Sequence, residues 1–415
     1  MKISVLMSVY GKHAVGGAER SAEKSAIELA RLGHQVSLVS LCASSDPSPQ
    51  IALPKGLTHD PIALAQIYDP YGLDHQKIAV PVVQSNLRKA LWHAADVYNP
   101  VMKSRLQALW NAQRPDLVIT HTLQGFSVAA WQAAKKSGAA LLHVIHDHAL
   151  ICPGTAMTRG PEVCDKPCSH CNLYSRARQF VSTSPDALVA PSRAVLNRHR
   201  QFGWFNDVTE QRVIENALLP DWPAVFTPLE VTTGRRLRFG FLGRLDQSKG
   251  LDTLLEAARV LTPDSFEIRL AGPGDPGAAI AFIAGHGLTS QIKLEGVVKA
   301  ADFLQGIDVL VTPSRAQETF CNVVMEAACL GIPAIVSDRG ALPERVDFGV
   351  SGWIVPAGDS QALAKAMQHC MDNRDQVAAR GAAALETRPR YDPARQGPAW
   401  AAACTAAIER HRASL

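Results

Sequence analysis

The segment PSRAQETFCNVVMEAACLGIPAIVSD, Pro313 to Asp338, decides the fold prediction. The apolar strand pattern IDVLVTP, Ile307 to Pro313, leads into this segment. An apolar run with helical spacing follows within the segment. Gly331 and Pro333 end this predicted helix, and AIVSD has the pattern of a second buried strand. A buried strand, a helix and another buried strand in this order predict a parallel βαβ unit.

Two glutamates, Glu318 and Glu326, lie eight positions apart at the start of the helical run. At a rise of about 1.5 Å per residue, this spacing predicts a separation of about 12 Å along a helix axis. That distance is comparable with the span from the sugar ring to the ribose of a nucleotide-sugar. One carboxylate could hold hydroxyls of a transferred sugar while the other holds the ribose, so the pattern indicates a carbohydrate site.

A second informative stretch, FGFLGRLDQSKG, lies upstream at Phe239 to Gly250. Its apolar strand ends at Gly243, and the cations Arg244 and Lys249 follow just before the helical pattern LDTLLEAARVL. Two cations at the carboxyl end of a strand and beside a helix N-terminus are typical of a site for a diphosphate.

A third element lies at the amino terminus, where the strand KISVLMSVY continues into GKHAVGGAER. Gly16 and Gly17 allow the backbone to approach a ligand closely, and a helix is expected to start near Ala18.

Strand and helix patterns alternate along both halves of the chain, which predicts an α/β fold with a doubly wound parallel sheet in each half. A length of 415 residues also favours two domains over one core. We expect an amino-terminal domain over 1–220 and a helix at the alanine-rich end (396–415), which a resemblance to a known family, given below, implies crosses back to that domain. A nucleotide-binding domain is expected over 221–395, after a linker at Pro220–Pro228, and the site in the cleft between the two sheets. The expected strands are Ile3–Val9, Gln35–Leu41, Leu117–Thr120, Ala140–Ile145, Ala187–Ala190, Arg212–Ile214, Arg238–Leu242, Glu267–Ala271, Ile292–Glu295, Val309–Thr312, Ala334–Ser337 and Trp353–Val355.

These motifs, together with the run GALPERVDFGVSGW at Gly340 to Trp353, resemble the retaining glycosyltransferases of family 4, which have the two-domain GT-B fold. The resemblance covers nearly the whole chain and is most specific from Phe239 to Asp359. It implies that Arg244 and Lys249 bind the pyrophosphate of a nucleotide-sugar donor. It further implies that Glu318 contacts the sugar, Glu326 the ribose, and the backbone N–H of Gly17 the distal phosphate.

The resemblance also places backbone amides of Thr319, Phe320 and Cys321 near the sugar and phosphate, with Asn322 completing this part of the donor site. This chain has Cys321 where the family more often has a glycine. Donor base selection is expected near the end of IKLEGVV, where Val297 lies.

A His–Asp pair follows the strand LLHVI, at His146 and Asp147. The family has a His–Asp pair at this point, and the resemblance implies that His146 hydrogen-bonds a hydroxyl of the transferred sugar. His121, which follows the strand DLVIT, is a second candidate.

The mechanism is expected to need no divalent ion at the diphosphate, because the sequence contains no Asp-x-Asp motif. Arg244, Lys249 and helix N-termini would then offset the charge of the leaving group. By resemblance the reaction retains the anomeric configuration and transfers a hexose to a glycan or lipid-linked acceptor in the biosynthesis of bacterial surface polysaccharide.

Four cysteines, Cys152, Cys164, Cys168 and Cys171, lie within 20 residues after His146, with the spacing C-x11-C-x3-C-x2-C. Three interpretations are open: a structural zinc site, an iron–sulfur cluster, or thiols without metal. The second interpretation leads to an alternative function, an iron–sulfur redox enzyme, which would leave the glutamate pair unexplained.

Charge and hydropathy bear on partners and location. Residues 1–220 contain 22 Lys and Arg against 16 Asp and Glu, while the remainder contains 20 against 22. A basic first half suits a phosphorylated or lipid-linked acceptor at an anionic membrane face, although it equally fits an ordinary solvated surface. Since neither an 18-residue apolar run nor a secretory signal pattern is present, we expect a cytoplasmic protein, peripheral to the inner membrane at most, that binds no nucleic acid.

Overall fold

The computed structural model describes residues 1–10, 17–42, 53–63, 86–159, 162–218, 222–223 and 234–415. The described chain divides into two compact units. Unit 1 comprises residues 1–155, 166–217 and 393–415, and unit 2 comprises residues 156–165 and 218–392. The predicted linker, Pro220–Pro228, lies outside the described residues except for Trp222 and Pro223.

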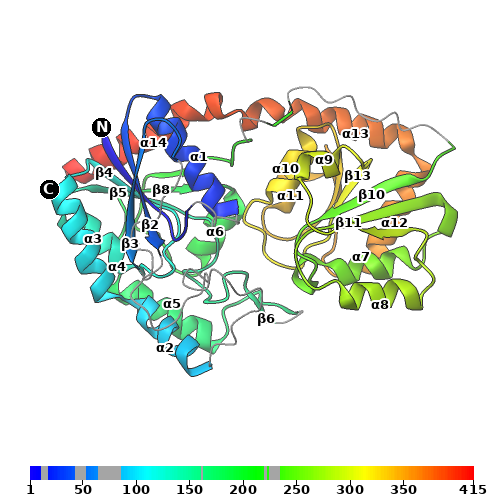
Figure 1. Cartoon of the computed structure of the whole chain (residues 1–415), viewed down its shortest axis with the longest axis horizontal. Helices are drawn as coiled ribbons and strands as arrows, with labels where there is room; N and C mark the ends of the chain where they lie inside the picture. The colour runs from blue at the N-terminus through cyan, green and yellow to red at the C-terminus, as the bar shows by residue number, and fades with distance from the viewer. Residues whose placement is uncertain (11–16, 43–52, 64–85, 160–161, 219–221, 224–233) are drawn as a thin grey trace. The chain divides into compact units, whose positions relative to one another are not determined.

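Unit 1 is built on a seven-stranded parallel sheet in the order β3-β2-β1-β4-β5-β8-β9 (Figure 1). Its strands are β1 (Lys2–Leu6), β2 (Gln35–Cys42), β3 (Leu57–Ala63), β4 (Leu117–Thr120), β5 (Ala140–Val144), β8 (Ala187–Ala190) and β9 (Gln211–Val213). Its helices are α1 (Gly17–Arg31), α2 (Asn86–Val97), α3 (Pro100–Gln113), α4 (Ala129–Lys136), α5 (Ser169–Val181), α6 (Arg193–Gln201) and α14 (Pro393–Ala413). A short antiparallel pair, β6 (Thr158–Arg159) and β7 (Glu162–Val163), follows β5 in the chain but belongs to unit 2.

Helices cover both faces of this sheet. Ala22, Ala26 and Leu29 of α1 join Trp400 and Ala403 of α14 in one core cluster with the strands. Two buried tryptophans also hold helices against the strands. The indole N–H of Trp110 in α3 donates to Ser4 Oγ of β1 at 2.9 Å, and the indole N–H of Trp131 in α4 donates to Thr120 Oγ1 of β4 at 3.1 Å. Each ring is therefore buried while its N–H has a hydrogen-bond partner.

Unit 2 is built on a six-stranded parallel sheet in the order β12-β11-β10-β13-β14-β15 (Figure 1). Its strands are β10 (Leu237–Leu242), β11 (Phe266–Ala271), β12 (Ile292–Leu294), β13 (Val309–Thr312), β14 (Ala334–Ser337) and β15 (Gly352–Val355). Its α-helices are α7 (Leu251–Ala258), α8 (Gly277–Gly285), α9 (Ala300–Leu304), α10 (Asn322–Ala328), α11 (Leu342–Arg345), α12 (Ser360–Asp372) and α13 (Arg374–Glu386). Short 3₁₀ helices lie at η2 (Gln247–Lys249), η3 (Pro263–Ser265), η4 (Asp347–Gly349) and η5 (Arg388–Tyr391).

The two faces of the unit 2 sheet have separate cores. Residues of α7, α8 and α12 form one cluster with β10 and β11, and residues of α9, α10 and α11 form the other. The predicted α/β class with two doubly wound parallel sheets is therefore confirmed. The strand order reverses between β10 and β13, and correspondingly between β1 and β4 in unit 1. In such sheets ligands bind at the carboxyl ends of the strands beside this reversal.

The predicted strands agree with the observed ones to within three residues at each end, and several agree at both ends. The prediction missed β3, which contains Pro61 and pairs only with β2 at the sheet edge. Proline is compatible with an edge position because the strand needs no donor on its free side. Within the part of the chain that the structure describes, no helix has both the length and the apolar character needed to cross a membrane.

Candidate active site

The turn after β10 fixes the first cationic residues of the site. Asp246 Oδ1 accepts hydrogen bonds from the backbone N–H of Lys249 at 3.1 Å and from Ser248 Oγ at 2.5 Å. Its other oxygen, Oδ2, lies 3.1 Å from Nε of Arg244. An aspartate that bonds the backbone three residues onward closes a short helical turn, so Asp246 sets the path of the chain from Arg244 to Lys249.

The turn after β10 lies directly against the loop after β13. Gly250 adopts a φ of +76°, and a Cβ added there would lie 2.0 Å from the carbonyl oxygen of Pro313. The carbonyl of Ser248 accepts from the backbone N–H groups of Arg315 at 2.9 Å and Ala316 at 3.0 Å. Glycine at position 250 is therefore required both by backbone conformation and by space.

This close packing forms a partly buried ion pair. Lys249 Nζ donates to Glu318 Oε1 at 2.7 Å, and Ser314 Oγ donates to the same oxygen at 2.7 Å. The Glu318 side chain is only 11% exposed. Burial alone would raise the pKa of Glu318, but Lys249 and these hydrogen bonds outweigh it, so the pKa is lowered. Burial likewise opposes the ammonium of Lys249, and the carboxylate of Glu318 outweighs it, so the pKa of Lys249 is raised. Both groups are charged at neutral pH.

The backbone of Glu318 is held as firmly as its side chain. Its carbonyl accepts from the N–H of Ala341 at 2.8 Å, and a Cβ on Gly340, which has a φ of +56°, would lie 2.1 Å from that carbonyl oxygen. The close approach explains the glycine that begins the run GALPERVDFGVSGW.

The spacing argument for the two glutamates is wrong in one respect. Glu318 lies in the loop before α10, because the helix begins only at Asn322. The rise of a continuous helix therefore does not set the separation of Glu318 and Glu326. Glu326 lies within α10 and is half-buried.

Cys321 occupies the position that the sequence marked as unusual. Its φ of 71° and ψ of 80° lie in the left-handed region, which favours glycine. Burial raises the pKa of its thiol to about 12, with Glu318 acting in the same direction. The cysteine is thus a neutral side chain in a conformation that costs roughly 1–3 kcal/mol for a residue other than glycine.

The remaining predicted donor residues are distributed over several elements. Thr319 and Asn322 are half-buried on either side of Phe320, whose ring is buried under the Arg345 guanidinium at 4.3 Å, so only the backbone of Phe320 is available to a ligand. Val297, in the turn after β12, is 78% exposed. Gly17 is the first residue of α1 in unit 1, and Gly16 lies outside the described residues.

Unit 1 brings two histidines together at its own strand ends. His121 follows β4, and His146 lies two residues after β5. His121 Nδ1 and His146 Nε2 are 2.7 Å apart, and the rings stack with centroids 5.0 Å apart. Burial lowers the pKa of His146 to about 4, and burial together with His146 lowers that of His121 well below its ordinary value. Both imidazoles are neutral at pH 7.

A neighbouring serine assigns the tautomers of this pair. Ser25 Oγ donates to the carbonyl of Ala22 at 2.8 Å, so it can only accept at its 3.4 Å contact with His121 Nε2. A neutral His121 that donates from Nε2 has an acceptor at Nδ1. His146 must then donate from Nε2, which leaves its Nδ1 as a hydrogen-bond acceptor. Sequence reasoning missed Ser25, as it missed Asp246 and Ser314; only the spacing of Asp246 to Lys249, typical of a capped turn, signalled any of them.

The four cysteines, for which the sequence left open a structural zinc site, an iron–sulfur cluster and thiols without metal, all lie among the described residues. Cys152 and Cys171 are both buried, with their sulfurs 3.5 Å apart, and Cys168 also contacts Cys171. Burial raises the pKa of the Cys171 thiol further above its ordinary value. Among the described residues, which include all four cysteines, no group of three or more His, Cys, Asp or Glu side chains is arranged to hold a metal ion. The contact between Cys152 and Cys171 joins the loop after His146 to α5.

Comparison with known protein families finds a match for each half of the chain. Residues 16–217 match the family model described as glycosyl transferase 4-like domain, and residues 236–373 match that described as glycosyl transferases group 1. The two models together span most of the chain.

The chain is also similar to individual proteins. An uncharacterized 42.6 kDa protein in the cps region of Klebsiella pneumoniae is 29% identical over 345 residues, or 83% of this chain and 87% of that protein. The amylovoran biosynthesis glycosyltransferase AmsK of Erwinia amylovora is 34% identical over 139 residues, or 31% of this chain and 34% of that protein. Among solved structures, HepE of Anabaena in complex with UDP superposes with a TM-score of 0.71 at 18% identity, covering 98% of this chain and 100% of that one.

Replacement of Gly250 tests the contact between the two loops. Gly250→Ala adds a Cβ that meets the Pro313 carbonyl, at a φ that disfavours alanine. We expect the free energy of unfolding to fall by about 2–3 kcal/mol. The control is Gly285→Ala at the end of α8, where nothing lies within 4 Å of the added Cβ. Equal urea-unfolding midpoints for the two variants would contradict the assignment.

Buried neutral histidines predict a loss of stability in acid. Burial lowers the pKa of His143 to about 3 and that of His199 to about 4, as it does for His146. Between pH 6.5 and about 4 the unfolded chain binds protons that the folded chain does not, so stability falls as the pH falls through this window.

The measurement is calorimetric unfolding at pH 7.5, 6.5 and 5. His199→Gln should reduce the pH dependence, because its imidazole is buried and bonded to the Val195 carbonyl at 2.9 Å. His286→Gln is the matched control, since His286 makes the same local bond to Phe282 at 2.9 Å but is exposed. A wild-type melting temperature that does not change between pH 6.5 and 5 would refute the prediction.

Proposed function

The chain is a glycosyltransferase with the GT-B fold, and on that premise we propose that it transfers a hexose from a nucleotide-sugar to a hydroxyl of a glycan or lipid-linked acceptor, with retention of configuration. The observation that supports this reaction most directly is the Lys249–Glu318 ion pair at the strand-order reversal of unit 2. With this assignment the alternative of an iron–sulfur redox enzyme is set aside.

Arg244 and Lys249 bind the donor diphosphate in this proposal. Both follow β10, and the Arg244 side chain is 59% exposed and so accessible to a phosphate. Lys249 is held at its backbone by Asp246 and at its ammonium by Glu318. Cations fixed in advance stabilise the charge that develops on the departing nucleoside diphosphate without having to reorganise during the reaction. No divalent ion is needed for this role.

Glu318 binds hydroxyls of the transferred sugar. Its Oε1 is already saturated by Lys249 and Ser314, so the second carboxylate oxygen is the natural acceptor for a sugar O–H. Because these two hydrogen bonds fix the carboxylate in place, it is positioned to bind sugar hydroxyls and not to attack the anomeric carbon as a nucleophile. Glu326 in α10 binds the ribose, and the turn containing Val297 contacts the base.

The backbone between Glu318 and α10 serves the diphosphate and sugar in this proposal. The left-handed conformation of Cys321 turns the chain into the helix, and the amides of Thr319, Phe320, Cys321 and Asn322 supply donors there. Gly17, at the start of α1, supplies a further amide to the distal phosphate. The neutral thiol of Cys321 adds no charge that would repel a phosphate.

His146 holds a sugar hydroxyl through its Nδ1. The tautomer set by His121 and Ser25 makes Nδ1 an acceptor, so the sugar O–H donates to it. As positive charge develops on the sugar ring, the hydroxyl becomes more acidic, and the neutral imidazole can accept its proton in part. The bond from the anomeric carbon to the diphosphate oxygen breaks and the acceptor oxygen bonds to the same face, while the acceptor proton passes to the departing phosphate.

A surface polysaccharide is the acceptor class that the relatives support. One relative is named for amylovoran biosynthesis and another lies in a cps region. The excess of basic residues over 1–220 suits a phosphorylated or lipid-linked acceptor at an anionic membrane face.

A thermal-shift panel of UDP, GDP, ADP and their sugars tests the proposed donor class. One base should raise the melting temperature most, because a ligand that binds only the folded chain stabilises it by mass action. Glu326→Ala should reduce the shift for that nucleotide and for its sugar alike, since the ribose is common to both. Glu256→Ala, on the exposed face of α7, is the control.

Turnover completes this test. Release of the preferred nucleoside diphosphate from its sugar should depend on an added glycan or lipid-linked acceptor and should persist in EDTA. If no nucleotide or nucleotide-sugar changes the melting temperature, or if EDTA abolishes turnover and Mg²⁺ restores it, the proposal is wrong in its donor or in its metal-free diphosphate site.

A further inference from the structure

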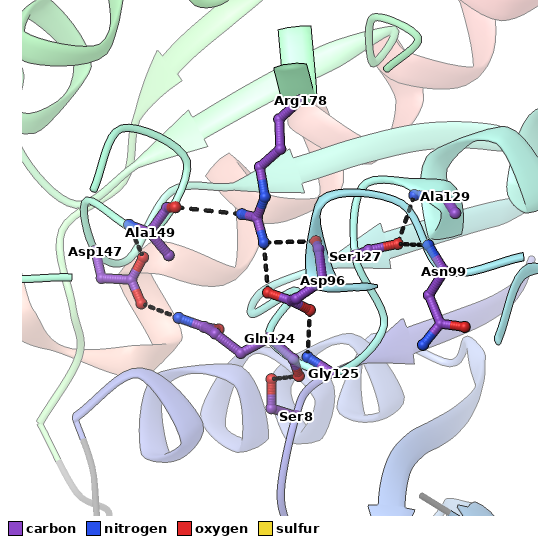
Figure 2. Close-up of polar contacts among 10 residues, drawn as sticks. All are labelled: Ser8, Asp96, Asn99, Gln124, Gly125, Ser127, Ala129, Asp147, Ala149 and Arg178. Atoms are coloured by element: carbon purple, nitrogen blue, oxygen red, sulfur yellow. Dashed lines mark hydrogen bonds and ion pairs between the residues drawn. The ribbon is translucent and has the colours of Figure 1, made fainter. Parts of the chain in front are cut away.

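A fully buried arginine lies beneath the loops that follow β4 and β5 in unit 1. Arg178 of α5 is 0% exposed, and Asp96 of α2 is 2% exposed. The Arg178 Nη2 group pairs with the Asp96 carboxylate and also donates to the Asp96 backbone carbonyl at 2.7 Å. Its Nη1 donates to the carbonyl of Ala149 at 3.2 Å, in the loop that contains His146 (Figure 2).

These contacts belong to a closed circuit of hydrogen bonds (Figure 2). The Oδ1 atom of Asp96 accepts a hydrogen bond at 2.7 Å from the N–H of Gly125, which lies in the loop that begins with His121. The adjacent Gln124 donates from Nε2 to Asp147 Oδ2 at 2.9 Å, and Asp147 Oδ1 accepts from the N–H of Ala149 at 2.8 Å. The circuit returns through the Ala149 carbonyl to the guanidinium of Arg178. The loop with His146 is therefore bonded to Arg178 directly, and the loop with His121 is bonded to Asp96, the ion-pair partner of Arg178.

Stability alone does not explain this ion pair. Burying an arginine and an aspartate costs several kcal/mol of desolvation, and apolar residues of similar volume often stabilise a core more. Nε of Arg178 has no hydrogen-bond partner, and burial raises the pKa of Asp96 to about 6 although Arg178 opposes the shift. Unlike apolar side chains, the Arg178–Asp96 pair makes directional hydrogen bonds to both loops.

We propose that Arg178 is a positioning residue for glycosyl transfer: through Asp96 and Ala149 it fixes the loops after β4 and β5, and so holds the His121–His146 pair in its working geometry. The inference rests on the proposed function, in which His146 contacts the transferred sugar. Arg178 acts through these loops and does not itself touch the substrate.

The test needs a variant that folds. Arg178→Met alone leaves the buried carboxylate of Asp96 without its cation, which is strongly destabilising. The double variant Asp96→Asn/Arg178→Met removes both charges, and the amide oxygen of asparagine can still accept from Gly125. Arg176→Met is the matched control, because Arg176 lies two residues away on the exposed face of the same helix.

A double-mutant cycle with His146 distinguishes positioning from plain stability. Under conditions where every variant is folded, Asp96→Asn/Arg178→Met should lower kcat by about 10²-fold, as misplacement by about 1 Å does, with the donor KM unchanged. In the His146→Ala background the same pair of substitutions should lower kcat by less than about threefold, because residues that act as a unit are not additive. Arg176→Met should match the wild type.

Additive effects in the cycle, or a double variant with the kcat of the wild type, would overturn the inference while leaving the proposed function intact. A readout independent of activity is amide hydrogen exchange. The double variant should exchange faster over 121–127 and 146–151, with β1 and β2 unchanged. Unchanged exchange in those two loops would overturn the inference even if no acceptor supports turnover. If only the proposed function were wrong, the faster exchange in the two loops would still be observed.

Discussion

The ion pair between Lys249 and Glu318 is the interaction on which the site in unit 2 depends. It joins the turn after β10 to the loop after β13, and these are the two strands between which the strand order reverses. Parallel strands on either side of such a reversal send their connections to opposite faces, which leaves a crevice at their carboxyl ends. The glycines at 250 and 340 serve this pair, since each allows a backbone approach that a Cβ would prevent.

Unit 1 has the same strand order at its centre but different chemistry at the strand ends. The connections after β4 and β5 supply His121 and His146. Both imidazoles are neutral, and His121 Nδ1 lies 2.7 Å from His146 Nε2. The charge lies underneath, in the pair of Arg178 and Asp96. A buried ion pair below and neutral acceptors above suit contact with uncharged hydroxyls, whereas the exposed guanidinium of Arg244 in unit 2 suits a diphosphate.

Apolar periodicity was sufficient to predict the two doubly wound sheets, because central parallel strands are buried on both faces and form continuous apolar runs. That the cations follow β10 and the histidines follow β4 and β5 could be read from the apolar runs that precede them, whereas the role expected of His146 came from the family resemblance. The buried circuit around Arg178 was not, since its members are brought together by tertiary structure and have no common spacing. The cysteine spacing left a metal site as one of three interpretations for a similar reason, because spacing alone does not show which sulfurs approach one another, as those of Cys152 and Cys171 do.

Equilibrium binding of a nucleotide-sugar, followed by calorimetry, tests the central role of the Lys249–Glu318 pair most directly. Lys249→Met should lose most of the affinity, by roughly 2–5 kcal/mol, as when one partner of a hydrogen-bonded charge pair is truncated. Lys293→Met is the matched control, because Lys293 forms an ion pair with Glu267 at 3.2 Å on an exposed strand edge of the same unit. We expect wild-type affinity for the control and near-complete loss of affinity for Lys249→Met. Equal affinity in the two variants would contradict the central role of the Lys249–Glu318 pair.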